Sequence, residues 1–435
     1  MRLRIQATSK PLAGRYCPPG DKSISHRVAI LGGLARGTSV IEGFLEAADT
    51  RATLAAMASL GAEVTESEGR IRITGGRLEA GNRTLDLGNS GTGMRLLAGM
   101  LSGRPELIGH TLTLIGDESL SARPMDRIIR PLSEMGARIG SREGRAPLSI
   151  EPQALHGIRY AMPVASAQVK SALLLAGLVA DGATVVVEPG PSRDHTERLL
   201  PAFGVDLLDG APGVGVRGGA ELRATELRVP GDLSSASFVM AAALMVPGSR
   251  VEVDNVGLNP TRDGVLRIID AMGGRVERLS DETVGLEPVG RLAVHGEGLR
   301  GLEIPPAWVP LAIDEFPIVM AMAAAAEGET VIRGARELRV KESDRLAVMC
   351  EALAAVGVDV TETPDGAVIR GGRVRGGRVD SHGDHRIAMS MAVLGLVSEG
   401  DIVVERAQWI ETSYPGFVDD MVALGADMQW EADDD

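Results

Sequence analysis

The sequence has few cysteines, few aromatic residues and no long apolar run. Two cysteines, Cys17 and Cys350, supply neither a disulfide framework nor a ligand set for zinc, which is typical of a reducing compartment. Aromatic residues make up 3% of the chain and the formal net charge is -14, which disfavours binding to nucleic acid or to anionic membranes. The apolar stretches "ALLLAGLVA" and "FVMAAALMV" fall short of the roughly 20 residues of a membrane span, and "MRLRIQATSKPLAG" lacks the apolar segment of a secretory signal. We therefore expect a cytoplasmic protein without nucleic-acid or membrane partners.

The chain is long, rich in glycine and sufficiently apolar to fold. Its 435 residues exceed the size at which one hydrophobic core keeps growing, and 44% of them are hydrophobic. Its 55 glycines and 23 prolines show no collagen-like period, so they indicate many turns in a globular protein. The composition therefore predicts a globular protein of two or more domains.

A short pattern recurs six times, as "SLGAEV", "EMGARI", "AFGVDL", "AMGGRV", "AVGVDV" and "ALGADM". Its central glycines are Gly61, Gly136, Gly204, Gly273, Gly357 and Gly425. A second glycine, followed by a β-rich run, precedes each of these by 22 to 29 residues, which leaves room for a strand, a loop and a helix. Before each second glycine lies an apolar segment of helical length, such as "SSASFVMAAALMVPG", which predicts a buried helix. The sequence therefore predicts six repeated βαβαββ-type units.

The segment "RVPGD" divides the six units into two sets of three. We predict an α/β protein with one domain at residues 21–229 and a second at residues 1–20 and 230–435. Strands should lie outside and the apolar helices inside. The leading strand "RLRIQAT" precedes the first helix, so we expect it to complete the last unit of the second, discontinuous domain.

The loops that enter the apolar helices carry hydroxyl and charged residues. They read "PGDKSISHR", "LGNSGTGMR", "VASAQVK", "PGDLSSAS", "AIDEFP" and "HGDHR". A helix N-terminus offers free N–H groups and a positive dipole end, so it favours phosphate or carboxylate. Five arginines lie at or near helix starts, where a cation opposes the dipole: Arg27, Arg123, Arg193, Arg345 and Arg386. This repeated mismatch favours bound anions, although a surface ion pair is the alternative for each arginine.

Other patterns in these loops are less specific. Lys22 and Ser23 lack the glycines of a nucleotide-binding P-loop, so ATP is not implied. His382 and His385 have a metal-like spacing but no third ligand nearby, so no metal is expected. Asp314 with Glu315 is read either as a helix cap or as a general base beside cations. Glu342 is read either as part of a solvated charged face or as a functional acid, and His26 and His195 as contact or capping residues.

These motifs resemble those of the enolpyruvyl transferases. The shared stretches, spread over all six units, are "PGDKSISHR", "LGNSGTGMR", "SARPMDR", "SAQVKSALLLAGL", "PGDLSSA", "IDEFP", "RVKESDRL" and "GDHRIAMS". The variants "SAQVKSA" and "RDHTER" look closer to the class II, glyphosate-tolerant-type branch than to the usual enteric sequences. The resemblance implies an inside-out α/β barrel, with buried parallel helices, outer sheets and an active site in the interdomain cleft. It also implies transfer of the enolpyruvyl group of phosphoenolpyruvate to the 5-hydroxyl of shikimate 3-phosphate, without metal or organic cofactor.

The resemblance also implies the site residues. Shikimate 3-phosphate is expected to contact Lys22, Ser23, Arg27, Ser166, Ala167, Gln168, Arg193, Asp314 and Lys341. Phosphoenolpyruvate is expected to contact Lys22, Gly91, Arg123, Gln168, Arg345 and Arg386. Fixed cations of this kind hold two mutually repelling anions at reacting distance. For catalysis we expect Asp314 to take the hydroxyl proton, while Glu342, aided by Lys22, protonates the methylene carbon.

The chain departs from the enteric pattern at Glu337 and Thr412, where asparagine and lysine are usual, so we assign neither residue to the site. Gly91 lacks the methyl group that crowds glyphosate in tolerant relatives, so we expect measurable inhibition by glyphosate, although Leu96 replaces the usual proline. We expect a monomer. Two alternatives remain: the sister transferase that acts on UDP-N-acetylglucosamine, and a non-catalytic anion-binding protein of the same fold.

Overall fold

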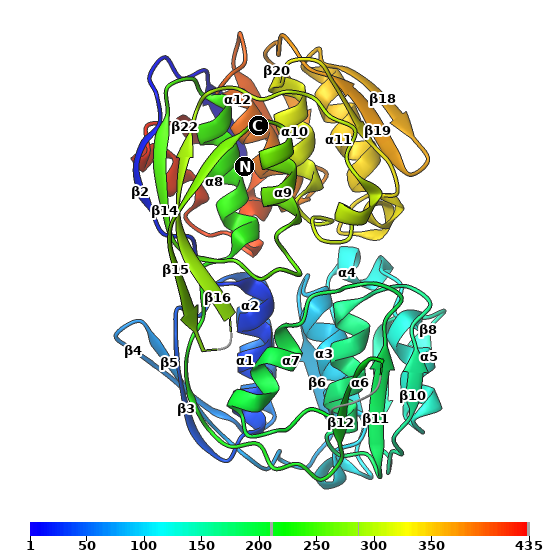
Figure 1. The fold of residues 1–435 in the computed structure, drawn as a ribbon. Coiled ribbons are helices and arrows are strands. Elements are labelled where there is room, and N and C mark those ends of the chain that lie inside the picture. Colours follow the sequence, from blue (N-terminus) through cyan, green and yellow to red (C-terminus); the bar gives the residue numbers. More distant parts are fainter. Residues whose placement is uncertain (209–211, 286, 433–435) are drawn as a thin grey trace. The chain divides into compact units, whose positions relative to one another are not determined.

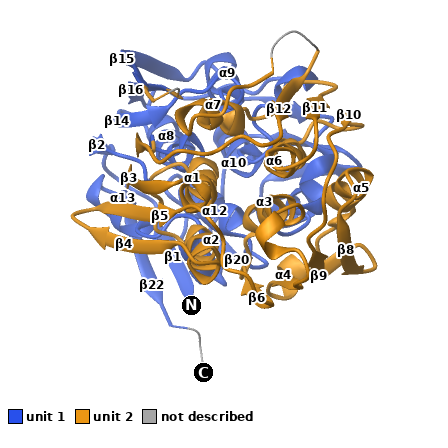
Figure 2. Ribbon diagram, turned by 90° about the horizontal axis from the view of Figure 1, so that it is seen from below, with its two compact units in different colours: residues 1–19, 230–283, 288–435 blue, residues 20–229, 284–287 orange. Residues whose placement is uncertain are grey.

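The computed structural model describes residues 1–208, 212–285 and 287–432, and the chain folds into two compact units. Unit 1 contains Met1–Pro19, Pro230–Thr283 and Pro288–Asp435. Unit 2 contains Gly20–Val229 and Val284–Glu287. Figure 2 colours the two units separately. The described residues form six small sheets, each of three or four strands.

Unit 2 contains three mixed sheets. The first has the order β13 (Glu226–Arg228), β3 (Gly37–Glu42), β5 (Arg70–Gly75), β4 (Glu63–Ser67). The second has the order β6 (Arg83–Asp86), β7 (Leu112–Ile115), β9 (Arg145–Glu151), β8 (Arg138–Arg142). The third has the order β10 (Arg159–Ala161), β11 (Ala183–Val187), β12 (Val214–Arg217). In each sheet the first pair is parallel and the later pairs are antiparallel.

The helices of unit 2 alternate with these strands. They are α1 (Lys22–Leu34), α2 (Ala48–Ser59), α3 (Gly91–Leu101), α4 (Glu118–Ala122), α5 (Asp126–Glu134), α6 (Ala167–Gly177) and α7 (His195–Ala202), with a 3-10 turn η1 (Pro105–Leu107). Figure 2 shows the sheets of this unit on its outside, around α1, α3 and α6. The first turns of α1, α3 and α6 begin within the glycine- and serine-rich loops "PGDKSISHR", "LGNSGTGMR" and "VASAQVK".

Unit 1 also contains three sheets. Their orders are β15 (Arg275–Val284), β16 (Glu287–His295), β14 (Arg250–Gly257), β2 (Ala13–Tyr16); then β17 (Glu329–Ile332), β19 (Gly366–Arg370), β18 (Asp359–Thr363); then β20 (Gly377–Asp380), β21 (Ile402–Glu405), β1 (Arg2–Gln6), β22 (Asp427–Glu431). Strand β1 pairs antiparallel with both β21 and β22, so the start of the chain belongs to the sheet that ends it.

The helices of unit 1 are α8 (Leu233–Met245), α9 (Gly264–Ala271), α10 (Phe316–Ala325), α11 (Arg345–Ala355), α12 (His385–Gly395) and α13 (Phe417–Ala423), with 3-10 turns η2 (Pro306–Trp308), η3 (Arg336–Val340) and η4 (Ala407–Thr412). Figure 1 labels α8 to α12 on the ribbon.

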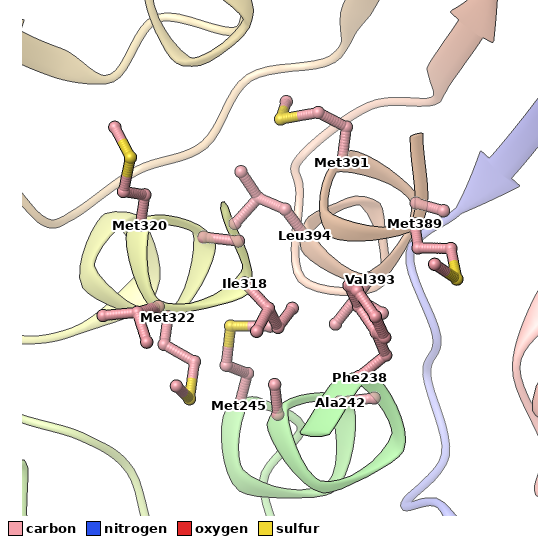
Figure 3. Packing of buried hydrophobic residues seen from close by; sticks show 14 of the residues in the cluster. Phe238, Ala242, Met245, Ile318, Met320, Met322, Met389, Met391, Val393 and Leu394 are labelled. Atoms are coloured by element: carbon pink, nitrogen blue, oxygen red, sulfur yellow. The ribbon is translucent and has the colours of Figure 1, made fainter. Parts of the chain in front are cut away.

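The central helices of unit 1 are buried on every face. All thirteen residues of α8 are buried, and so are residues 316–324 of α10. Figure 3 shows side chains of α8, α10 and α12 packed against one another, among them Phe238, Ile318 and Leu394. Burial of a side chain of this size stabilises the folded chain by about 1.5–3 kcal/mol. Helices buried on every face therefore carry apolar residues on every face.

The six repeated glycines share one backbone conformation. Each follows a helix and has a positive φ, between 78° and 105°. This left-handed conformation ends a helix and is favourable for glycine, which has no Cβ. The repeated sequence pattern therefore marks six helix ends, those of α2, α5, α7, α9, α11 and α13.

No helix within the described residues is long and apolar enough to span a lipid bilayer.

Candidate active site

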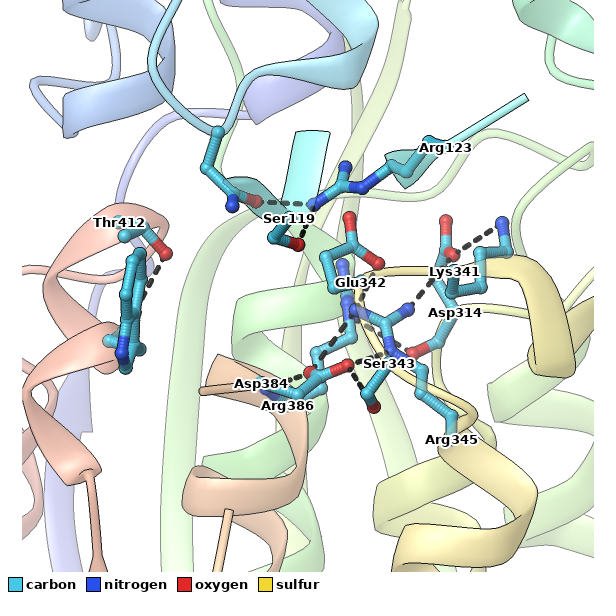
Figure 4. A network of polar contacts seen from close by, with 12 residues as sticks. Ser119, Arg123, Asp314, Lys341, Glu342, Ser343, Arg345, Asp384, Arg386 and Thr412 are labelled. Atoms are coloured by element: carbon cyan, nitrogen blue, oxygen red, sulfur yellow. Dashed lines mark hydrogen bonds and ion pairs between the residues drawn. The ribbon is translucent and has the colours of Figure 1, made fainter. Parts of the chain in front are cut away.

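In unit 1 the loop before α10 lies beside the start of α11. Asp314 Oδ1 is 3.1 Å from Lys341 Nζ and 3.5 Å from Arg345 Nη1 (Figure 4). Helix α10 begins at Phe316, and neither Asp314 nor Glu315 caps it through a side chain. Asp314 is therefore a carboxylate held by two cations rather than a helix cap.

Arg345 is the centre of this cluster. Its side chain is 1% exposed, and its guanidinium lies 2.7 Å from Glu342 Oε2 and 2.7 Å from Asp384 Oδ2. Burial alone would lower the pKa of Arg345, but Asp384, Glu342 and Asp314 outweigh it, so the pKa is raised and the cation is firmly held. Glu342 is 24% exposed, so it belongs to this ion-pair network and not to a solvated face.

Arg386 lies in the first turn of α12. Its Nη1 donates to Ser234 Oγ, and also to the Asp314 carbonyl over 3.0 Å. Its backbone N–H donates to Asp384, which caps the helix. The structure therefore brings together five of the residues predicted from the sequence: Asp314, Lys341, Glu342, Arg345 and Arg386.

In unit 2 the start of α1 presents Lys22, Ser23 and Arg27. Asp21 caps the helix through Ile24 N–H, and Lys22 pairs with Asp49 of α2. Arg27 is 3% exposed, and its guanidinium donates to side chains of two other helices and to its own helix. Those acceptors are Thr196 Oγ1 at 2.7 Å, Ser171 Oγ at 2.7 Å and the Ser23 carbonyl at 2.8 Å. Burial lowers the pKa of Arg27 to about 10, against the attraction of Glu197 and Asp21.

The start of α6 carries Ser166, Ala167 and Gln168, all partly exposed. Ser166 caps the helix through Val169 N–H. Gln168 Oε1 accepts from Arg95 Nη1 over 2.6 Å, and its Nε2 donates to Thr92 Oγ1 over 2.8 Å. Gln168 therefore joins the first turn of α6 to the N-terminal part of α3.

Gly91 and Arg123 lie close together at the start of α3. A Cβ added to Gly91 would be 3.0 Å from Arg123 Nη1 and 3.3 Å from Arg95 Nη1. Arg123 is 6% exposed and donates to Asn89 Oδ1 and to Ser119 Oγ (Figure 4). Two guanidiniums thus border the N-terminal turn of a helix, a suitable arrangement for an anion.

Arg193 lies two residues before the start of α7 and is near enough to Arg27 for its charge to lower the pKa of Arg27. In the next turn His195 Nδ1 is 2.7 Å from Glu287 Oε1, while Asp194 pairs with Arg198 over 2.9 Å. Asp194, His195 and Glu287 are close enough together to resemble a metal site, but His195 and Glu287 bond each other and Asp194 is neutralised by arginine.

His26, His382 and Thr412 have local partners. His26 is fully buried, and its Nδ1 bonds Thr53 Oγ1 over 2.8 Å. His382 Nε2 lies 3.7 Å from Glu351 Oε2. Thr412 donates to the Trp409 carbonyl within η4 (Figure 4).

Sequence reasoning missed the residues that hold the predicted ones in place. They are Asp49, Asn89, Arg95, Ser119, Ser171, Thr196, Ser234 and Asp384. Asp384 carried a signal, because it stands between His382 and Arg386 in "SHGDHR". Asn89, Arg95, Ser171, Thr196 and Ser234 also stand in the quoted motifs, but the motifs do not indicate which residues these side chains contact.

Comparisons with known proteins agree with this picture. A solved structure of EPSP synthase from Acinetobacter baumannii superposes with a TM-score of 0.86, at 42% identity over 98% of this chain and 99% of that one. A second structure of EPSP synthase from the same organism superposes with a TM-score of 0.86, at 41% identity over 99% of this chain and 100% of that one. The chain is thus a mixed α/β protein with the EPSP synthase fold.

The sequence comparisons define the family. The family model described as EPSP synthase (3-phosphoshikimate 1-carboxyvinyltransferase) matches residues 6–421. The 3-phosphoshikimate 1-carboxyvinyltransferase of Acidithiobacillus ferrooxidans is 53% identical over 93% of this chain and 94% of its own length. That of Methylococcus capsulatus is 51% identical over 94% of both chains. The chain belongs to the EPSP synthase family, which confirms the resemblance seen in its motifs.

Proposed function

We infer that the chain is a 3-phosphoshikimate 1-carboxyvinyltransferase of the shikimate pathway. The enzyme transfers the enolpyruvyl group of phosphoenolpyruvate to the 5-hydroxyl of shikimate 3-phosphate, and the products are 5-enolpyruvylshikimate 3-phosphate and phosphate. The observation that carries this inference is the family match across residues 6–421. The cationic helix starts of both units suit two anionic substrates.

Shikimate 3-phosphate is proposed to bind residues of both units. In unit 2 we assign Lys22, Ser23, Arg27, Ser166, Ala167, Gln168 and Arg193, with Ala167 acting through its backbone N–H. In unit 1 we assign Asp314 and Lys341. Arg27 already donates to Ser23, Ser171 and Thr196, so part of its role is to fix the loops that carry the other ligands.

Phosphoenolpyruvate is proposed to bind Lys22, Gly91, Arg123, Gln168, Arg345 and Arg386. The close approach of Gly91 to Arg123 supports a site for its carboxylate or phosphate at the start of α3. Arg345 and Arg386 supply cations from unit 1, each oriented by Asp384 or Ser234. Such fixed positive charge stabilises the dianion that leaves.

The proposed chemistry has two steps, addition and elimination. Asp314 takes the proton of the 5-hydroxyl as its oxygen bonds to C2 of phosphoenolpyruvate, and Glu342, aided by Lys22, gives a proton to the C3 methylene. The product of addition is a tetrahedral intermediate. In the elimination step the C2–O bond to phosphate breaks, C3 returns a proton to Glu342, the departing phosphate carries away the proton held by Asp314, and the enol ether forms.

The finer architecture stays a prediction. We propose an inside-out α/β barrel of three repeats per domain, with domains at 21–229 and at 1–20 with 230–435 and the substrates bound in the interdomain cleft. The three sheets of each unit support the repeat count. A cytoplasmic monomer is also expected, and analytical ultracentrifugation of the purified chain tests its oligomeric state.

The activity is tested by phosphate release from phosphoenolpyruvate. The purified chain is assayed with shikimate 3-phosphate and, separately, with UDP-N-acetylglucosamine. We expect release with the first substrate only. Release with the second alone would assign the sister transferase activity, and release with neither would favour a non-catalytic anion-binding protein.

A further inference from the structure

A buried lysine in unit 2 is shared by two carboxylates. Lys170 of α6 is 1% exposed, and its Nζ lies 2.6 Å from Glu188 Oε2 and 2.6 Å from Glu197 Oε1. Glu188 follows β11, and Glu197 lies in the first turn of α7. Ser192 donates to the other oxygen of Glu188, which closes the loop between β11 and α7. One ammonium thus joins a helix, a loop and a second helix.

This triad lies beside the hydroxyl contacts of Arg27. Ser171, the next residue on α6, bonds Thr196, the residue before Glu197 on α7, over 2.7 Å. Both hydroxyls accept from the Arg27 guanidinium. Two successive residues of α6 therefore contact two successive residues of α7, and Arg27 of α1 bonds to both helices.

The elements tied in this way carry most of the unit 2 residues assigned to shikimate 3-phosphate. Ser166, Ala167 and Gln168 form the start of α6, and Lys170 follows two residues later. Arg193 lies next to Ser192, and Ser23 accepts from Arg27. None of the residues of the triad is among those assigned to either substrate.

We propose that Lys170, Glu188 and Glu197 form a positioning triad that sets the spacing of the shikimate 3-phosphate ligands on α6 and on the loop before α7. The inference rests on the proposed function. A buried ion pair adds little net stability compared with apolar packing, but its loss leaves uncompensated charge, so such groups are suited to fixing one geometry. Burial raises the pKa of Glu197, and the Lys170 ammonium opposes that change, so loss of the ammonium would leave this buried carboxylate without its cation.

The test is steady-state kinetics of phosphate release by the wild-type chain and three variants. Lys170→Met removes the ammonium, Glu188→Gln keeps the shape but removes one charge, and Ser192→Ala frees only the loop. The exposed Lys10→Met is the matched control. Thermal denaturation shows which variants are folded, and Glu188→Gln and Ser192→Ala carry the test if Lys170→Met does not fold.

We expect the KM for shikimate 3-phosphate to rise roughly two- to thirtyfold in Lys170→Met and less in the other two variants. The KM for phosphoenolpyruvate should stay within about twofold of wild type, because its assigned ligands lie mainly on other elements. A residue with a purely structural role would lower the melting temperature without separating the two KM values. Folded variants with a wild-type KM for shikimate 3-phosphate would overturn the triad, whereas a wild-type chain without activity would overturn the proposed function.

Discussion

Glu342 Oε2 lies 2.7 Å from Nη2 of Arg345, three residues further along the chain. The same guanidinium lies within 3.5 Å of Asp314 and 2.7 Å of Asp384. One buried cation therefore orients the two carboxylates proposed as acid and base. This arrangement makes the role of each carboxylate separable by substitution.

Glu342→Gln should lower kcat by roughly 100- to 10,000-fold, because the amide cannot deliver a proton to C3. Binding of both substrates should remain, since the amide keeps the shape of the side chain, and calorimetry with each substrate checks this. Glu351→Gln, an exposed carboxylate on α11, is the control. Near-normal turnover with both substrates bound would show that another group donates the proton.

Asp384→Asn should destabilise unit 1 by about 3–5 kcal/mol, because it leaves Arg345 buried without its principal anion. Asp384 is 0% exposed and also accepts from Ser343 over 3.0 Å. The matched control is Asp380→Asn, which breaks a half-exposed pair with Arg406 and should cost about 0–1 kcal/mol. Denaturant unfolding measures the free energy of unfolding of both variants. Equal losses of stability in the two would contradict the assignment of Asp384 as the buried partner of Arg345.

Local patterns in the sequence predicted several of these features for physical reasons. Helix starts follow from capping residues such as Asp21, and the repeated glycines follow from the positive φ of a helix end. The family resemblance supplied the identities of the proposed site residues. The supporting contacts could not be predicted, because Thr196 and Ser171 reach Arg27 from distant parts of the chain and short polar side chains have no periodic signal.

Gly91→Ala should raise the KM for phosphoenolpyruvate and weaken inhibition by glyphosate. The added methyl group would be 3.0 Å from Arg123 Nη1, a distance at which the guanidinium must move. Gly190→Ala is the control, because a Cβ there meets nothing within 4 Å. If Gly91→Ala leaves both constants at wild-type values, Arg123 does not bind the donor substrate.

Because of His26, the protein should be less stable in mild acid than at neutral pH. Burial lowers the pKa of His26 well below its usual range, and the charges of Lys22 and Arg27 lower it further. Below about pH 6.5 the unfolded chain therefore binds a proton that the folded chain does not, and stability falls by about 1.4 kcal/mol per pH unit until the folded pKa is reached. In His26→Gln the difference between the melting temperatures at pH 7 and pH 5 should be smaller than in the wild-type chain. An unchanged pH dependence in that variant, with the exposed His156→Gln as control, would contradict this origin.

The two cysteines should differ sharply in reactivity, and neither should be needed for turnover. Burial, and to a lesser extent Glu362, raises the pKa of Cys350 to about 12, so almost none of it is thiolate at pH 8. Cys17 is exposed. A thiol reagent such as 5,5′-dithiobis(2-nitrobenzoic acid) should therefore modify one residue quickly, and Cys17→Ser should abolish that phase while keeping the activity. Loss of turnover in Cys17→Ser would instead indicate a thiol acid, the chemistry expected of the sister transferase.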